Sequence, residues 1–315
     1  MDKRLKELKR VIKFLVRPKE YYKNIQICGR EAKYLPHFIA DRMKIECKRG
    51  EIASFNTYSF TTILHYHRAP IKLFFTQENT HVNESRWQWF EEIWIKESSL
   101  ALTCGFDYAE HPKYMRFPYW LEHMFAVNIT NEQLRDFVKK YNISKDSSTR
   151  VKDCAFICKK DYFGDRAQMA DLVAQVIPLN YPSDFRHNDD DMRGRFGDDK
   201  IAYLRQFRFN LCPENSNNRG YVTEKVFEAI KAGCVPIYWG NEGYPEPDIL
   251  NPKAIVYLDK DKPEEGLTLL RKLYDDPKAY AEFAAQPRFL PGAADKIYAY
   301  YERLEAKLRE VLLRK

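Results

Sequence analysis

Several motifs that define large enzyme classes are missing from this chain of 315 residues. No G-x-G-x-x-G follows an apolar run and no G-x-x-x-x-G-K-[ST] occurs, so dinucleotide and P-loop classes lose their main support. The motifs G-x-S-x-G and H-E-x-x-H are also missing, which weakens assignment to the hydrolases that use them. Only 12 glycines are present, so long flexible linkers are not expected.

The sequence also has no apolar run of membrane-spanning length and no apolar segment typical of a signal peptide. Its seven cysteines are odd in number and scattered, which argues against a disulfide framework. The pair Cys154-x-x-x-Cys158 has no second metal-like pair, so a zinc site is not expected. We therefore expect a protein of a reducing cytosol.

The composition that remains is that of an ordinary globular protein, with 44% hydrophobic and 31% charged residues. Its length is sufficient for two domains with substantial cores. The net charge of +7 indicates either a lysine-rich surface or an anionic partner. A phosphorylated small molecule and a membrane surface are the favoured partners, and no nucleic-acid partner is expected because no such motif occurs.

One stretch, residues 207–239, predicts a complete βαβ unit. The apolar run 207–212 is typical of a buried strand. A polar turn follows, and Thr223 then opens a helical pattern with one apolar face. Gly233 ends that helix, and residues 235–239 form a second strand. The intervening loop lies where parallel sheets bind ligands, at a strand's carboxyl end and a helix's amino end.

Comparable patterns occur on both sides of this unit. A polar, weakly patterned segment at 128–150 is our expected boundary between two halves, and 181–199 reads as a charged loop. Residues 1–17 and 293–315 predict basic amphipathic helices, for which packing on the protein is favoured over membrane attachment. Strands are predicted at 24–28, 71–76, 99–106, 153–158 and 255–258, and helices at 31–43, 87–97, 166–176, 264–274 and 277–285.

Two polar loops contain candidate site residues. Glu78 follows the strand IKLFFT, where burial among aromatic rings would raise its pKa and suit it to act as a general base. The alternative is an exposed carboxylate bonded to its own loop, which the pattern alone favours. In the second loop, Lys225 provides positive charge at a helix amino end, and Glu224 can accept two hydroxyl donors. A capped helix with a surface ion pair is the alternative there. Arg166 is a further candidate for binding phosphate.

The stretch FNLCPENSNNRGYVTEKVFEAIKAGCVPIYWG closely resembles the signature of the α1,3/α1,4-fucosyltransferases. FFTQENTH is similar to the acceptor-side loop of that family, and GFDYAEHPKYMRFPYW to the stretch that follows it. HNDDD and DKIAYLRQF are similar to the segments that lead into the signature. The resemblance covers about residues 70–300.

This resemblance implies an α/β protein of GT-B fold, with two facing Rossmann-like domains, a cleft between them and a C-terminal helix crossing back. We expect an acceptor domain at 1–148, a GDP-fucose domain at 149–292 and an amphipathic helix at 293–315. The implied reaction transfers L-fucose from GDP-fucose, with inversion, to the 3-hydroxyl or 4-hydroxyl of GlcNAc in LacNAc and Lewis-type glycans. A GT-B transferase that uses another nucleotide sugar in lipopolysaccharide or capsule synthesis is the alternative, and a non-catalytic lectin-like or membrane-associated scaffold is a third hypothesis.

By similarity to the family, Glu78 is the general base, and Arg166 binds the donor phosphates even though its loop, KKDYFGDR, departs from the asparagine- and proline-rich form of bacterial members. The remaining matches to donor-binding positions are Glu214, Asn215, Tyr221, Glu224 and Lys225. Glu224 would hold the ribose or fucose hydroxyls, and Lys225 the diphosphate, whose growing charge it stabilises as GDP leaves.

The run Asp189-Asp190-Asp191 has the D-x-D spacing of metal-binding sugar transferases of the GT-A type. Because Lys225 and Arg166 would neutralise the phosphates, we expect no required metal and interpret the run as a solvated acidic loop. Stimulation by Mn²⁺ or Mg²⁺ is the alternative. The leucine-rich heptads of some bacterial members and the N-terminal anchor of the vertebrate Golgi type are both missing, so we expect a bacterial cytoplasmic enzyme, with peripheral contact at the inner membrane through its basic helices as an option.

Overall fold

The structure is a computed structural model that describes residues 18–29, 32–56, 67–81, 99–143 and 150–313, with single residues at 8, 9, 12, 16 and 64. The predicted helix at 87–97 lies outside the described residues, as does nearly all of the predicted helix at 1–17. The chain divides into a first unit, Met1–Ile129 with Tyr300–Lys315, and a second unit, Thr130–Ala299. The domain limits expected at 148 and 292 stay predictions.

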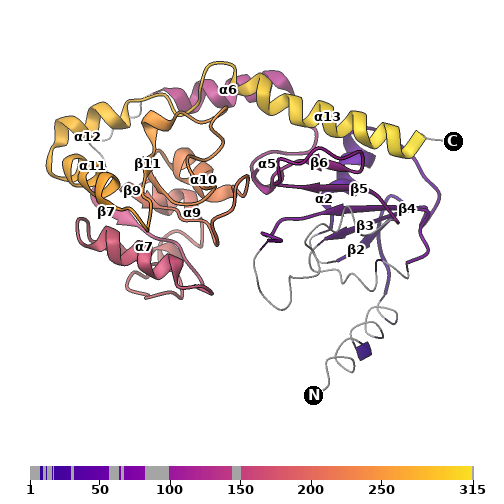
Figure 1. The fold of residues 1–315 in the computed structure, drawn as a ribbon, viewed down its shortest axis with the longest axis horizontal. Helices are drawn as coiled ribbons and strands as arrows, with labels where there is room; N and C mark the ends of the chain where they lie inside the picture. Colours follow the sequence, from indigo (N-terminus) through magenta and orange to yellow (C-terminus); the bar gives the residue numbers. More distant parts are fainter. Residues whose placement is uncertain are drawn as a thin grey trace. The chain divides into compact units, whose positions relative to one another are not determined.

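The first unit contains a sheet of six described strands in the order β1-β2-β3-β4-β5-β6 (Figure 1). β1 pairs antiparallel with β2, and the other neighbours pair parallel. The strands predicted at 24–28, 71–76 and 99–106 are confirmed as β2, β4 and β5. Their bounds are β1 (Glu20–Tyr22), β2 (Ile25–Cys28), β3 (Ile52–Asn56), β4 (Ile71–Phe75), β5 (Leu100–Gly105) and β6 (Tyr114–Arg116).

Short helices accompany this sheet, namely α2 (Tyr34–His37), η1 (Phe38–Arg42) and α5 (Tyr119–Met124). The helix predicted at 31–43 is therefore shorter at its start and changes to a π-helix in η1. Pro36 lies in the first turn of α2, where its missing N–H costs no helical hydrogen bond.

The predicted C-terminal helix is confirmed as α13 (Ala293–Leu313), whose last part returns to the first unit. Tyr301, Leu304 and Leu308 are completely buried. The Tyr301 hydroxyl donates a hydrogen bond of 3.2 Å to the carbonyl of Leu121 in α5. The apolar stripe of this helix therefore packs on the protein, which is the arrangement that we favoured over membrane attachment.

The second unit contains a sheet of five described parallel strands in the order β11-β10-β9-β7-β8. The predicted βαβ unit is confirmed as β9 (Phe207–Leu211), α10 (Glu224–Ala232) and β10 (Val235–Tyr238). Gly233 ends α10 with φ of 78°, a left-handed conformation that glycine adopts without strain. The other strands are β7 (Lys152–Ala155), β8 (Leu179–Asn180) and β11 (Val256–Tyr257).

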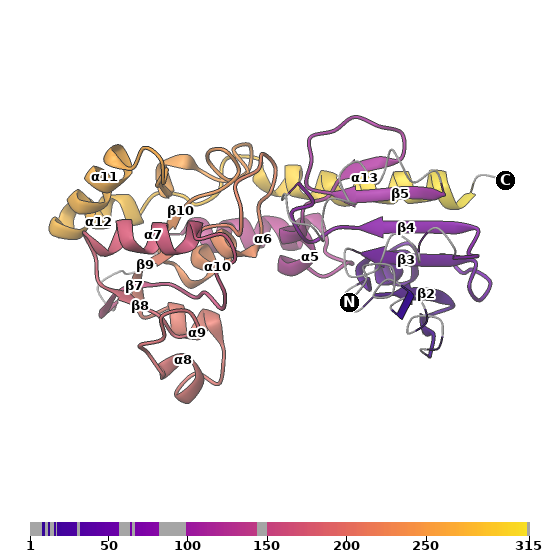
Figure 2. The ribbon, with the colours of Figure 1, turned by 60° about the horizontal axis from the view of Figure 1, so that its bottom comes forward.

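Helices α7 (Asp165–Ala174), α11 (Glu264–Asp275) and α12 (Pro277–Ala284) confirm the helices predicted in this half. The predicted loop at 181–199 instead contains the short helix α8 (Asp191–Gly194), and α9 (Lys200–Leu204) follows it. Figure 2 shows α8 and α9 beside the edge of the sheet formed by β7 and β8. The turn η2 (Pro252–Ala254) precedes β11.

The segment at 128–150, our expected boundary between two halves, contains the division between the two units and also helix α6 (Asn131–Asn142), which we did not predict. The Thr130 hydroxyl accepts a hydrogen bond from the backbone N–H of Gln133, and the Gln133 side chain accepts one from the N–H of Thr130. This reciprocal capping box was readable as T-x-x-Q in the sequence. Leu134 alone among the helix residues is fully buried, which explains the weak apolar pattern.

Candidate functional site

The loop between β9 and α10 is built around the carboxylate of Glu214, which has no exposed surface. One carboxylate oxygen accepts a 2.8 Å hydrogen bond from the backbone N–H of Thr223. The other accepts from the Thr223 hydroxyl at 2.7 Å and from the Lys225 ammonium at 3.0 Å. A Cβ at Gly240 would lie 2.7 Å from Cγ of Glu214, so the backbone there leaves room only for glycine. Glu214 therefore holds the loop together from inside.

This arrangement changes the amino end of α10. Thr223 is the N-cap residue, yet its side chain makes no capping hydrogen bond; its hydroxyl donates to Glu214 and accepts from the Lys225 ammonium at 2.8 Å. The amino end of the helix consequently has no side-chain cap from this residue, and Lys225 lies in its first turn. Helix amino ends with these features attract anions.

Lys225 carries its charge in a mostly buried position, with 21% of its side chain exposed. Burial lowers the pKa of Lys225, but the carboxylates of Glu214 and Glu224 outweigh that effect and raise its pKa above the ordinary value. The charge of Arg166 acts in the opposite direction but is outweighed by the carboxylates, so Lys225 keeps its positive charge.

Arg166 reaches this loop from the first turn of α7. Its guanidinium donates to the side-chain oxygen of Asn215 and to the carbonyl of Lys160, the latter at 2.7 Å. Its Nε atom is buried and has no hydrogen-bond partner within the described part of the chain. At the amino end of α7, the Asp161 carboxylate accepts a 2.8 Å hydrogen bond from the backbone N–H of Ala167. Arg166 and Asn215, predicted as donor-site residues, are thus brought into contact.

A small pocket of about 50 Å³ opens beside these groups. Arg166, Glu224 and Lys225 line it, as the sequence led us to expect of donor-binding residues. Glu214, Asn215 and Tyr221, the other predicted donor-site residues, do not line it. Three polar lining residues were not anticipated, namely Asn210, Lys200 and Glu228. The one sequence signal for Glu228 is its position four residues after Glu224, which places the two carboxylates on one face of α10.

The candidate base, Glu78, lies in the first unit, directly after β4. It is half-buried, and the Thr76 hydroxyl donates a 2.8 Å hydrogen bond to its carbonyl. A second polar pair lies in the same loops, where Nε2 of His81 is 2.5 Å from a carboxylate oxygen of Asp107. Since β4 and β5 run parallel, Glu78 and Asp107 follow the same edge of the sheet. Sequence reasoning missed this His–Asp pair because its partners come from two different strand ends.

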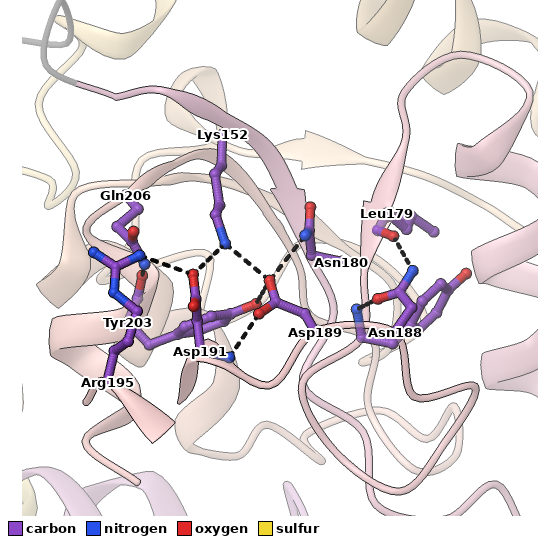
Figure 3. Close-up of polar contacts among 10 residues, drawn as sticks. Lys152, Leu179, Asn180, Asn188, Asp189, Asp191, Arg195, Tyr203 and Gln206 are labelled. Atoms are coloured by element: carbon purple, nitrogen blue, oxygen red, sulfur yellow. Dashed lines mark hydrogen bonds and ion pairs between the residues drawn. The ribbon is translucent and has the colours of Figure 1, made fainter. Parts of the chain in front are cut away.

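The acidic run at 189–191 is only partly the solvated loop that we expected. Asp190 is exposed, but the side chain of Asp189 is only 5% exposed. One oxygen of Asp189 accepts hydrogen bonds from Lys152 at 3.0 Å, Asn180 at 2.8 Å and Tyr203 at 2.9 Å (Figure 3). Lys152 also donates to Asp191 at 2.8 Å. The expectation was therefore wrong for Asp189, which ties the start of β7 to β8 and α9.

This network predicts an acid-sensitive contribution to stability. Burial raises the pKa of Asp189, but hydrogen bonds from the Asp191 backbone, Lys152 and Tyr203 outweigh it and lower the pKa below its ordinary 3.8. The folded state therefore favours ionised Asp189, and the gain is lost as the pH falls below about 4. Asp189→Asn should cost about 1–3 kcal/mol in unfolding free energy at pH 7, a difference that narrows between pH 5 and pH 3. Urea denaturation across that range measures it.

The matched control is Asp190→Asn, which removes a neighbouring carboxylate whose side chain is 96% exposed. It should leave the unfolding free energy within about 0.5 kcal/mol of the wild type at every pH. Equal losses in the two variants, or a difference for Asp189→Asn that does not depend on pH, would contradict a role for the ionised Asp189.

The loop between β9 and α10 lies in a segment that matches a known protein family. Residues 197–286 match the family model "Glycosyltransferase family 10 (fucosyltransferase) C-term". This segment of the second unit is therefore similar to the family 10 glycosyltransferases. Within the matched segment lie five of the predicted donor-site residues, Glu214, Asn215, Tyr221, Glu224 and Lys225, whereas Glu78 and Arg166 lie outside it.

Curated relatives extend the family 10 similarity beyond that segment. The chain is 35% identical over 235 residues to "Alpha-(1,3)-fucosyltransferase FucT" of Helicobacter pylori, covering 70% of this chain and 47% of the relative. It is also 35% identical over 86 residues to "Alpha-(1,4)-fucosyltransferase" of Arabidopsis thaliana, covering 27% of this chain and 21% of that one. The chain thus spans less than half the length of these relatives. The resemblance identified from the sequence is confirmed.

Solved structures of similar fold are also fucosyltransferases. "Crystal Structure of alpha1,3-Fucosyltransferase" has a TM-score of 0.53 at 19% identity and covers 80% of this chain and 77% of its own. "Crystal Structure of alpha1,3-Fucosyltransferase with GDP" has a TM-score of 0.52 at 17% identity and covers 97% and 87%. The predicted GT-B fold is confirmed.

Proposed function

We propose that this family 10 protein transfers L-fucose from GDP-fucose to the 3-hydroxyl, or alternatively the 4-hydroxyl, of GlcNAc in LacNAc and Lewis-type glycans. The observation that carries the proposal is that two cations line one pocket, Lys225 from the first turn of α10 and Arg166 from the first turn of α7. A nucleoside diphosphate is the anion that such a site suits, since it brings two adjacent phosphates to two cations and to helical N–H groups. A further solved structure of similar fold, "Crystal Structure of alpha1,3-Fucosyltransferase with GDP-fucose", supports GDP-fucose as the donor.

In the proposed site, Arg166 and Lys225 bind the diphosphate and stabilise the charge that grows on GDP as it leaves. Glu224, at the first position of α10, accepts hydrogen bonds from the ribose or fucose hydroxyls. Asn215 orients the Arg166 guanidinium through their hydrogen bond. Glu214 acts through Lys225 and Thr223, because it is buried beneath them. Tyr221 is also buried and supports the loop from within.

We propose Glu78 as the general base of a single direct displacement. Its carboxylate would take the proton of the acceptor hydroxyl while that oxygen attacks the anomeric carbon of fucose, and the bond to GDP breaks on the opposite side. Attack from the side opposite to GDP inverts the anomeric centre. The position of Glu78 after a buried strand of the first unit, half-buried and tethered by Thr76, supports this role.

We also propose that transfer needs no metal ion. Asp189 and Asp191, the candidate ligands at D-x-D spacing, already share the ammonium of Lys152, and Arg195 donates a further 3.1 Å hydrogen bond to Asp191. Binding a divalent cation there would have to displace these cations. Lys225 and Arg166 provide the charge that a metal would otherwise bring to the diphosphate.

Contact with a membrane stays a proposal based on the basic terminal segments. Within the described residues, no helix is both long enough and apolar enough to cross a bilayer. The lysines and arginines of residues 1–17 would favour an anionic membrane surface.

The function is tested by thermal unfolding with GDP, UDP and CMP and their sugars, followed by product analysis with GlcNAc-containing acceptors. A ligand at about 100 times its Kd stabilises the folded state by about 2.7 kcal/mol, so the correct nucleotide should raise Tm clearly. Lys225→Ala should abolish most of this shift with GDP. It should also lower kcat/KM, by an amount that corresponds to roughly 3 kcal/mol of lost transition-state stabilisation. The matched control, Lys272→Ala, removes an exposed lysine of α11 and should change neither.

Stabilisation by UDP- or CMP-sugars instead of GDP-fucose would favour the alternative of a GT-B transferase with another donor. A GDP-induced shift that survives in Lys225→Ala would contradict the diphosphate role of that lysine. Fucose transfer onto a LacNAc acceptor would exclude the non-catalytic scaffold.

A further inference from the structure

Two carboxylates lie along one face of α10. Glu224 occupies the first position of the helix and Glu228 follows four residues later, and both line the pocket described above. Four residues of α-helix advance about 6 Å along its axis. This spacing matches the distance between a ribose and the far part of its base, so a nucleoside held at Glu224 by its ribose would place its base near Glu228.

Glu228 faces a cation from another helix. The ammonium of Lys200, the first residue of α9, lies 3.5 Å from the carboxylate of Glu228. That distance exceeds an ordinary N–H···O hydrogen bond of about 2.7–3.2 Å, so the two groups form an ion pair without a short hydrogen bond. The Glu228 side chain is 14% exposed and that of Lys200 42% exposed, which leaves both within reach of a ligand from the pocket.

Apolar groups complete the wall of this pocket. Phe156, Ile157 and Leu204 line it together with the two charged residues. A flat aromatic base gains from such a surface, while its polar edge needs charged partners. Its volume of about 50 Å³ suits the edge of a base rather than a whole nucleotide, and Glu224 and Lys225 line the same pocket.

We propose that Lys200 and Glu228 recognise the guanine base of the donor. The inference rests on the proposed use of a GDP-linked sugar. Guanine presents a hydrogen-bond acceptor, O6, beside two donors, N1–H and the N2 amino group. The Lys200 ammonium can donate to O6, and the Glu228 carboxylate can accept from N1–H and N2 with its two oxygens. Adenine and cytosine present the reverse pattern, and uracil lacks the second donor.

Inosine diphosphate provides the discriminating probe, because hypoxanthine is guanine without the N2 amino group. Calorimetric titration of the full chain should show that wild type binds GDP at least about tenfold more tightly than IDP, since IDP leaves one carboxylate oxygen unmatched. Glu228→Gln should weaken GDP binding by at least about tenfold and bring the ratio of the affinities for GDP and IDP close to one. Lys200→Met should weaken both nucleotides about equally, because O6 is common to them.

The matched control is Glu265→Gln, at an exposed position of α11, which should keep the wild-type ratio. Both variants should fold, because Glu228→Gln preserves the size of the side chain and Lys200 is partly exposed. The Tm of each variant without ligand checks this. An unchanged GDP-to-IDP ratio in Glu228→Gln, with GDP still bound, would overturn the inference and leave the proposed function standing. If wild type bound no GDP, both would be overturned.

Discussion

Glu78→Gln should lower turnover by about 10²–10⁴ while GDP-fucose affinity stays near the wild-type value. The substitution keeps the shape of the side chain but removes its ability to accept a proton, so the acceptor hydroxyl must attack while still protonated. Donor affinity should persist because the cations proposed to bind GDP, Lys225 and Arg166, belong to the second unit and Glu78 to the first. Steady-state kinetics with a LacNAc acceptor and titration with GDP together separate the two effects.

Glu110→Gln is the control for this substitution, since Glu110 is exposed and lies in the same unit. Its turnover should equal that of the wild type. If Glu78→Gln turned over normally, Glu78 would be removed from the mechanism. A parallel fall in GDP affinity and turnover would instead indicate that the substitution disturbs the donor site rather than proton transfer.

Glu214→Ala should lower the free energy of unfolding by about 3–5 kcal/mol, because it leaves the mostly buried ammonium of Lys225 without the carboxylate to which it donates a hydrogen bond. The same change removes the acceptor for the backbone N–H and hydroxyl of Thr223. Urea denaturation should show a lower midpoint with an unchanged slope, as expected when stability changes but the buried surface does not.

The double variant Glu214→Leu with Lys225→Met tests whether the buried charge is the cause. Replacing both members of a buried ion pair by apolar residues of similar size is often close to neutral, so the double variant should recover much of the stability lost in Glu214→Ala. It should still fail to bind GDP, because the proposed diphosphate contact is missing. A double variant that is as unstable as Glu214→Ala would attribute the loss to packing instead.

The central βαβ unit was predictable because each of its boundaries has a local cause. Apolar runs mark β9 and β10, Thr223 marks the start of α10, and Gly233 ends it by adopting a left-handed conformation. Helix α6 was missed for the opposite reason: a single fully buried residue, Leu134, gives almost no apolar periodicity. Its capping box at Thr130 was present in the sequence but was not used.

In the candidate site, too, some side chains were predictable from the local sequence and others were not. Lys225 and Arg166 were predicted from residue type and position, and both line the same pocket in the structure. The burial of Glu214 could not be predicted, because it depends on Gly240 leaving room for its side chain. Asp189 was misjudged since its partners, Lys152, Asn180 and Tyr203, come from three separate elements.

Local sequence was sufficient to predict the parallel α/β architecture, the resemblance to the fucosyltransferases and the cations of the proposed donor site, because strand, cap and turn signals act between near neighbours in the chain. The pairing of charges required the folded structure. Lys200 meets Glu228, and His81 meets Asp107, only because packing brings together segments more than 20 residues apart. Whether a carboxylate supports the protein, as Glu214 does, or faces a ligand pocket, as Glu228 does, depends on which atoms cover it, and no local pattern encodes that burial.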